Sequence, residues 1–249
     1  MAELREASRP ERHVRATASV ALRHEVQCGH DRFSMPRLAR PAAGRRTPVA
    51  RRSRPRGDRV ERCGWATLSD PLYLHYHDRE WGVPLRDERR LFELLCLEGA
   101  QAGLSWRTIL HRREGYRRAF LGFDPERLAD LSDEDLSRLR EDPGIVRNRQ
   151  KILSVRSNAQ ALCAMRARGE DFAEFLWSFV GGSPEVHHYA ALSEVPARTA
   201  ASDALSRALR ERGFSFVGST ICYAFMEAAG LVMDHLVGCY RYGELVGGQ

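Results

Sequence analysis

The chain has 249 residues, of which 43% are hydrophobic, enough for one large or two small domains with a buried core. No run of eighteen apolar residues occurs, which excludes a typical membrane-spanning helix, and the first residues lack the apolar stretch of a secretion signal. We therefore expect a cytoplasmic protein. The net charge of +6 arises in residues 1–60, which hold 15 Arg and six acidic residues, whereas residues 61–249 carry a net −3. The overall charge therefore does not support a nucleic-acid-binding core.

Residues 1–59 are rich in Arg, Pro, Ala and Ser and show little hydrophobic periodicity. Such a segment cannot bury enough apolar surface to become ordered, so we expect a disordered tail followed by one folded domain over residues 60–249. The basic run 45–59 could instead be a non-specific DNA or RNA arm, and an Arg-rich, acid-poor leader is also typical of organelle transit peptides. A gene start placed too early, with the true start near Met35 or Val60, is a further interpretation.

From Arg62 onward, apolar residues recur at spacings of three and four, which predicts a series of amphipathic helices. Turn signals such as Asp142-Pro143-Gly144 separate them, and no alternating β pattern of useful length occurs. The predicted fold is therefore all-α. The predicted helices span residues 87–102, 105–113, about 133–141, 145–167, 170–179, 202–212 and 220–229.

A carboxylate interrupts the apolar face of the predicted helix 87–102. Asp87 can cap this helix, and its apolar stripe, formed by Leu91, Leu94 and Leu95, continues at Glu98. A buried carboxylate is costly unless it is paired or functional. Trp106 follows within two turns, and Gly99 and Gly103 leave the nearby backbone uncovered, a combination that suits a flat ligand. The alternatives are a surface glutamate at the edge of the stripe, or one that accepts a hydrogen bond from a buried backbone amide.

Residues 202–229 have the pattern of a helix, a short glycine-containing loop and a second helix. Ser202 is the expected N-cap of the first helix, and Gly213 is its expected end. The loop and the second helix's N-terminus would expose backbone N–H groups that can bind a DNA phosphate at Gly218, Ser219 and Thr220. Gly218 leaves space for the phosphate to approach. A plain packing hairpin is the alternative.

Four candidate metal ligands lie near the two ends of the predicted folded part: Cys63, His77, His235 and Cys239. The i, i+4 spacing of His235 and Cys239 would allow one helical turn to present both side chains. Two thiolates and two imidazoles form a closed tetrahedral set for a structural zinc ion, which would join the ends of the fold. The alternative is buried cysteines with hydrogen-bonded histidines, and His75 is a rival ligand.

Long ordered strings of residues carry a resemblance to one protein family. The strings are RCGW at 62–65, DPLY at 70–73, YHDREWGVP at 76–84, LEGAQAGLSW at 97–106, WSFV at 177–180, SDALS at 202–206, GFSFVGSTICY at 213–223 and DHLVGC at 234–239. Over residues 61–249, about three quarters of the chain, the sequence closely resembles bacterial DNA-3-methyladenine glycosylase I. The resemblance implies the helix-hairpin-helix DNA glycosylase fold, with the damaged base flipped out of the duplex. It also implies one zinc ion held by the four candidate ligands, and a base pocket formed by Glu98, Trp106, Tyr73 and Tyr76.

The expected activity is that of a monofunctional glycosylase, which hydrolyses the N-glycosidic bond of N3-methyladenine in alkylated double-stranded DNA. We expect a monomer with no membrane partner, and leave open whether 3-methylguanine is also released. Trp106 would stack on the cationic base, and Glu98 would accept hydrogen bonds from its donor edge. Leu104 is the expected wedge that fills the gap in the duplex. Arg147 and Lys151 are expected phosphate contacts or, alternatively, part of a solvated helix face.

One position departs from the pattern of many relatives of this fold, which place an aspartate after the second hairpin helix. Met233 occupies that position here, and Asp234 lies one residue later. A thioether cannot do acid–base work, so we expect catalysis to depend on a weakened glycosidic bond and on recognition of the departing cation. The substrate range should therefore be narrow, and Lys151, the single lysine, is not expected to support β-elimination. The rival functions are a non-catalytic DNA-binding module and a zinc-dependent hydrolase.

Overall fold

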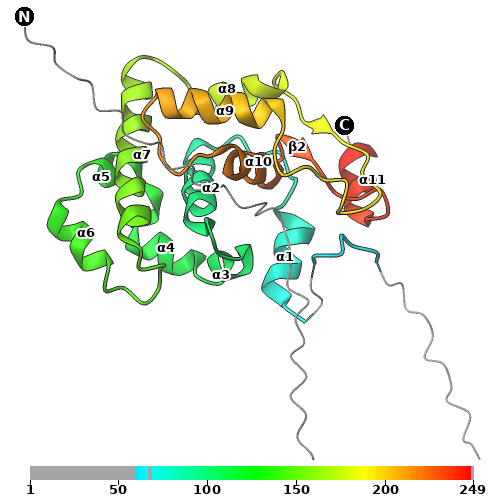
Figure 1. Ribbon diagram of the computed structural model, residues 1–249, viewed down its shortest axis with the longest axis horizontal. Helices are drawn as coiled ribbons and strands as arrows, with labels where there is room; N and C mark the ends of the chain where they lie inside the picture. The colour runs from blue at the N-terminus through cyan, green and yellow to red at the C-terminus, as the bar shows by residue number, and fades with distance from the viewer. Residues whose placement is uncertain (1–59, 67–68, 248–249) are drawn as a thin grey trace, which may run out of the picture.

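The computed structural model describes residues 60–66 and 69–247, so the predicted tail 1–59 lies outside the described residues. The described part is mostly helical, as the periodicity predicts (Figure 1). Its α-helices are α1 (Pro71–Arg79), α2 (Glu88–Gln101), α3 (Trp106–Leu110), α4 (Arg113–Ala119), α5 (Pro125–Ala129), α6 (Asp133–Leu139), α7 (Arg149–Ala167), α8 (Phe172–Trp177), α9 (Ala200–Glu211), α10 (Ser219–Ala228) and α11 (Tyr240–Gly247). The other described elements are the 3-10 helices η1 (Leu121–Phe123) and η2 (Ser178–Val180) and the strands β1 (Glu185–Val186) and β2 (Val232–Met233).

Side-chain caps explain where most of these helices begin. An Asp, Ser, Thr or Asn side chain accepts a hydrogen bond from the first turn at Asp70, Asp87, Ser105, Asp124, Ser132, Asn148, Asp171 and Thr199. The predicted cap at Asp87 is confirmed. The predicted cap at Ser202 is wrong, because Thr199 caps α9 and the Ser202 hydroxyl accepts from the Thr199 N–H at 2.9 Å, completing a capping box. The helix predicted from 145 begins instead at Arg149, because the Asn148 side chain caps it there.

Helices α2 and α10 lie side by side at the centre of the fold, with α9 packed on α10 and α7 packed on both α2 and α5 (Figure 1). Leu91, Phe92 and Leu95 of α2 and Phe225 and Met226 of α10 are almost fully buried. Burial of large apolar side chains is the main stabilising term for such a core. The arrangement also places the predicted hairpin, α9 to α10, beside the helix that carries Glu98.

A parallel pairing of two short strands was not predicted from the periodicity. Glu185 of β1 pairs with Val232 of β2, and Val186 pairs with Met233. Strands of two residues are too short to show an alternating pattern. The pairing brings His187 next to Asp234, with the His187 Nδ1 atom 2.6 Å from an Asp234 carboxylate oxygen.

The two ends of the described fold lie together. The backbone N–H of Tyr240 donates to the carbonyl of Glu61 at 2.9 Å, and Arg62 makes a bidentate ion pair with Asp78. None of the helices in the described residues combines the length and the apolar character needed to cross a bilayer.

Candidate active site and metal centre

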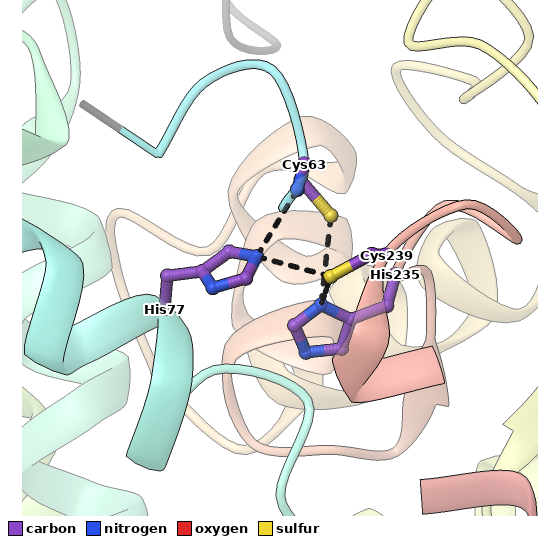
Figure 2. Close-up of side chains that lie close together, drawn as sticks. All are labelled: Cys63, His77, His235 and Cys239. Carbon is purple, nitrogen blue, oxygen red and sulfur yellow. Dashed lines mark hydrogen bonds between the residues drawn. The ribbon is translucent and has the colours of Figure 1, made fainter. Parts of the chain in front are cut away.

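Four buried side chains from the two ends of the fold converge on one point (Figure 2). Cys63 precedes α1, His77 lies on α1, and His235 and Cys239 lie between β2 and α11. Their ligand atoms all lie within 4.8 Å of one another. The Cys63 Sγ to His235 Nδ1 distance is 3.5 Å, the Cys239 Sγ to His77 Nε2 distance is 3.5 Å, and the Cys239 Sγ to His235 Nδ1 distance is 3.6 Å. The cluster has the residues and the spacing to hold a metal ion, and it joins the N- and C-terminal regions.

The outer nitrogens of both histidines have hydrogen-bond acceptors. His77 Nδ1 lies 2.8 Å from Asp78 Oδ1, and His235 Nε2 lies 3.1 Å from the carbonyl oxygen of Trp81. Such partners fix the tautomer, and they leave His77 Nε2 and His235 Nδ1 as the nitrogens that face the cysteine sulfur atoms. Arg62 and His77 hold the pKa of Asp78 to about 2, against the opposing effect of its burial, so this carboxyl is ionised.

The local presentation of two ligands differs from the prediction. His235 and Cys239 do not share a helical turn, because α11 begins only at Tyr240 and the ligands lie in the turn before it, where the Cys239 N–H donates to the Leu236 carbonyl at 2.7 Å. The i, i+4 spacing therefore brings the two side chains together through an irregular turn. The rival ligand His75 is exposed on α1 and lies outside the cluster.

A pocket beside the metal site contains all four predicted base-binding residues. Glu98 of α2, Trp106 of α3 and Tyr73 and Tyr76 of α1 line it together. The other residues of its wall are Trp65, Trp81, Gln101, Ala197, Thr220, Tyr223, Ala224 and Glu227. The predicted pairing of a carboxyl and an indole in one cavity is therefore present.

Glu98 lies at the inner end of the α2 stripe and is 4% exposed. Burial alone raises the pKa of this carboxyl to about 8, since no ion pair or hydrogen bond among the described residues offsets it. This excludes both alternatives from the sequence, a surface position and a bond to a buried amide. Burial disfavours the ionised form of Glu98 in the empty pocket. A cation that enters the pocket would stabilise this ionised form by charge–charge attraction.

Aromatic rings form most of the remaining wall. The Tyr76 and Trp106 ring centroids are 5.3 Å apart with planes tilted by 45°, and the Trp65 and Tyr73 centroids are also 5.3 Å apart. The indole Nε1 of Trp106 is buried with no hydrogen-bond partner in the described structure. Burial raises the pKa of Tyr73 to about 12 and that of Tyr76 well above its usual value, so both hydroxyls are neutral at physiological pH.

Sequence reasoning missed a second acid in this wall. Glu227 of α10 is 5% exposed and lies within the apolar run 224–229. Behind it, the two oxygens of Asp234 bind the Tyr223 hydroxyl and His187 Nδ1, each at 2.6 Å. A lone glutamate inside an otherwise apolar helix was the signal that could have revealed Glu227, by the same argument that revealed Glu98. Met233 is buried and does not line the pocket.

The two glycines near Glu98 have different roles. A Cβ atom on Gly99 would lie only 3.1 Å from the Phe216 Cβ, so the hairpin loop and not a ligand covers this position. Gly103 has a φ of +76° and open space around it, which lets the chain turn sharply after α2. Leu104 follows this turn and is half-buried against the core.

The predicted helix–loop–helix is present as α9, a loop and α10. Gly218 is the N-cap of α10, and Ser219 and Thr220 form its first turn, with Thr220 also lining the pocket. The loop before it is anchored to the core, because the Ser206 hydroxyl donates to the Val217 carbonyl at 2.6 Å. A helix N-terminus without a side-chain cap leaves backbone N–H groups available to an anion.

The two predicted basic contacts lie in different surroundings. Arg147 is exposed in the loop before α7. Lys151 is half-buried, and its ammonium donates to the carbonyls of Ala100 and Ala102, at 2.8 and 2.6 Å. It therefore caps the C-terminal end of α2, where a cation is favourable to the helix dipole.

A helical hairpin beside an acidic, aromatic pocket is the arrangement of a DNA glycosylase that works on a flipped base. Comparison with known proteins agrees. The family model described as methyladenine glycosylase matches residues 65–242, and the chain belongs to this family. The DNA-3-methyladenine glycosylase 1 of Escherichia coli (strain K12) is 56% identical over 183 residues, covering 74% of this chain and 97% of that protein.

Solved structures give the same result. A crystal structure of 3-methyladenine DNA glycosylase I has 56% identity and a TM-score of 0.71, over 72% of this chain and 98% of that one. The 3-methyladenine DNA glycosylase I of Staphylococcus aureus, solved to explain its recognition of 3-methyladenine, has 42% identity and a TM-score of 0.69, over 72% of this chain and 95% of that one.

Proposed function

We propose that this protein removes N3-methyladenine from alkylated double-stranded DNA by hydrolysing the N-glycosidic bond, as a cytoplasmic monomer. The single observation that carries the proposal is that Glu98 and Trp106 line one cavity. Family membership supports it, and so do relatives whose names state this activity.

Recognition begins with extraction of the base from the helix. Unstacking costs roughly a few kcal/mol, and the hairpin would contribute by holding a backbone phosphate at Gly218, Ser219 and Thr220. Leu104, on the turn after α2, would occupy the gap in the duplex. Arg147 is exposed and available to a second phosphate. Lys151 donates two of its three ammonium N–H groups to the end of α2. The third N–H could donate to a DNA phosphate while these two bonds are kept.

Inside the pocket, the charge of the lesion is the distinguishing property. Methylation at N3 leaves a positive charge on the purine, which gains about 2 kcal/mol from a desolvated indole face such as that of Trp106. Glu98 would accept hydrogen bonds from the amino edge of the base as a carboxylate. The neutral hydroxyls of Tyr73 and Tyr76 add donors without adding charge. An unmodified adenine would bring no charge to offset the ionisation of Glu98.

The chemical step requires little from the protein. The glycosidic bond of a cationic purine is already weak, because the electron pair of the breaking bond neutralises the ring as the base leaves. Stabilisation of the flipped, charged base by Glu98 and Trp106 therefore has only to hold it outside the duplex. Met233 supplies no acid–base group. A neutral lesion gains none of this stabilisation, so a narrow substrate range follows.

The metal site fits zinc. Tetrahedral zinc with Zn–S of about 2.3 Å and Zn–N of about 2.05 Å has sulfur-to-nitrogen edges of about 3.6 Å, close to the distances between these ligands. Cys63, His77, His235 and Cys239 would hold the ion, and its contribution would be to folding, because four protein ligands leave no position for a substrate. This argues against a zinc-dependent hydrolase.

The test is the identity of the bases released from DNA treated with a methylating agent, separated by chromatography. We expect 3-methyladenine to be released, with no strand cleavage, and neutral lesions such as mismatched bases to remain. Release of a neutral lesion at a comparable rate would contradict the mechanism. DNA binding without any release would favour the non-catalytic module.

A further inference from the structure

The turn that follows α2 has an unusual backbone and an exposed position. Ala102 is the C-cap of the helix, with a non-helical ψ of 116°, and Gly103 follows with a φ of +76°. The Leu104 N–H then donates to the Gln101 carbonyl at 2.6 Å, which closes the turn. A Cβ built on Gly103 would meet nothing within 4 Å, so packing at this glycine does not hold the turn in place.

A residue from another helix fastens the turn instead. Lys151 lies in the first turn of α7, 49 positions after Ala102 in the chain. Its ammonium donates to the carbonyl of Ala100 at 2.8 Å and to that of Ala102 at 2.6 Å. Lys151 forms no ion pair with any residue that the structure describes, so these carbonyls are the polar partners of its charge. One cation therefore fixes both the last turn of α2 and the first residue of the chain reversal.

The same two bonds change the charge that this end of α2 presents. The last carbonyls of a helix carry negative partial charge, which would repel the phosphates of DNA. Lys151 covers two of these carbonyls with positive charge, and Arg147 and Arg149 are exposed close to it in the chain. The end of α2 can therefore approach DNA without this repulsion.

We propose that Lys151 is a positioning residue for extrusion of the base, because it holds the turn that carries Leu104 in one conformation before DNA binds. This inference rests on the proposed function, in which Leu104 occupies the gap left by the flipped base. A turn that is already ordered loses little conformational entropy when Leu104 enters the duplex. The role differs from that of a phosphate contact, because it acts through Leu104 and does not require Lys151 to touch DNA.

A double-mutant cycle tests whether Lys151 acts through Leu104. Single-turnover release of 3-methyladenine from methylated duplex DNA is measured for the wild type, Lys151→Met, Leu104→Ala and the double variant. Methionine keeps an apolar stem but removes the charge and the donors. We expect Lys151→Met to slow release by about tenfold, Leu104→Ala to slow it at least as much, and the double variant to be no slower than Leu104→Ala.

Two results of the cycle would overturn the proposal. Unchanged release in Lys151→Met would show that the turn needs no fastening. A double variant that loses the product of the two single effects would show that Lys151 acts independently of Leu104, as a phosphate contact does. Arg149→Met is the matched control in the same turn of α7, because it removes a charge and leaves both bonds to α2 in place. An equal loss in this control would assign the effect to charge alone.

Binding of the free base separates this role from damage to the pocket. Free 3-methyladenine enters the pocket without any need for Leu104, so its affinity, measured by calorimetry, should be nearly the same in Lys151→Met and in the wild type. A loss of free-base affinity as large as the loss of release rate would mean that Lys151 supports the pocket wall and not the turn, which overturns the proposal.

Amide hydrogen exchange in the free wild type gives a test that needs no variant. The Leu104 N–H should exchange slowly, because the turn is closed before DNA binds. Exchange as fast as in an unstructured chain would overturn the proposal, even if Lys151→Met does not fold. Absence of 3-methyladenine release by the wild type contradicts the proposed function itself, whereas normal release with independent losses in the cycle contradicts only the role of Lys151.

Discussion

The rings of Tyr76 and Trp106, with centroids 5.3 Å apart, form a wall shared by the base pocket and a second cavity. Arg113 and Arg117 line the second cavity, and they are paired with Glu80 and Glu93. The two cavities therefore differ in character. Among the described residues, the acids that line the base pocket form no ion pair and lie among aromatic rings, whereas the second cavity is lined by ion pairs.

Removal of the indole should weaken recognition of the cationic base. We expect Trp106→Leu to lower kcat/KM for release of 3-methyladenine by about tenfold to a hundredfold, because the base loses its stacking and cation–π partner. Single-turnover release from methylated DNA measures this effect. Unchanged kinetics in a variant with normal circular dichroism would show that the base does not stack on Trp106.

Neutralisation of the pocket carboxylate should have a larger effect. Glu98→Gln removes the charge but keeps the shape, and we expect kcat/KM to fall by about a hundredfold, the value of a charge-assisted hydrogen bond in a dry site. Glu93→Gln is the matched control on the same helix, since Glu93 binds Arg117 outside the base pocket. Equal losses in the two variants would mean that the effect is structural.

The raised pKa of Glu98 predicts two pH dependences. Because the ionised form binds the cation and the pKa in the free protein is about 8, kcat/KM should rise with pH up to about 8 and then level off. The folded pKa is above the ordinary value of 4.5, so the unfolded chain ionises first, and stability falls as pH rises from 4.5 to about 8.

Glu98→Gln should abolish both the rise of kcat/KM up to about pH 8 and the fall of stability between pH 4.5 and about 8. At about pH 9 the variant should be more stable than the wild type by on the order of a few kcal/mol, and the two should converge near pH 5. Urea unfolding at several pH values tests the second profile. A wild-type-like pH dependence in the variant would assign the titration to another group.

Loss of the metal should destabilise the fold. We expect one zinc ion per chain by elemental analysis, and a large fall in Tm for Cys63→Ser or after treatment with a strong chelator, because the ends of the fold then lose their link. His75→Ala is the control, since His75 is exposed on the same helix as His77. A full complement of metal in Cys63→Ser would refute the ligand assignment.

The hairpin can be tested by adding one methyl group. A Cβ on Gly218 would meet only an Arg210 side-chain nitrogen at 3.6 Å, so Gly218→Ala should fold normally. If a phosphate approaches this backbone, the variant should bind duplex DNA several-fold more weakly, with little change in the binding of free 3-methyladenine. Gly243→Ala on α11, where a Cβ meets nothing within 4 Å, is the control. Equal DNA affinity in the two variants would locate the phosphate elsewhere.

Local patterns in the sequence predicted much of this protein. Glu98 was identifiable because a carboxylate replaced a leucine in the stripe of α2, and the hairpin because glycines and caps mark helix ends in the chain itself. The predicted N-cap of α9 was wrong by three residues, because Thr199 and Ser202 are both good caps and only their mutual hydrogen bonds decide between them. The four metal ligands were candidates from their residue types alone, and the resemblance grouped them in one site, because the two pairs are more than 150 residues apart and no periodic signal connects them.

The sequence by itself determined the helical class, the family and the residue types of the site, because these depend on spacing along one chain. The tertiary structure alone decided which buried groups face each other. It placed Glu227 in the wall of the base pocket, turned Lys151 toward the end of α2, and formed β1 against β2 so that His187 reaches Asp234. Such contacts depend on packing between segments far apart in the chain, where the cost of burying a charge is set by the neighbours that folding supplies.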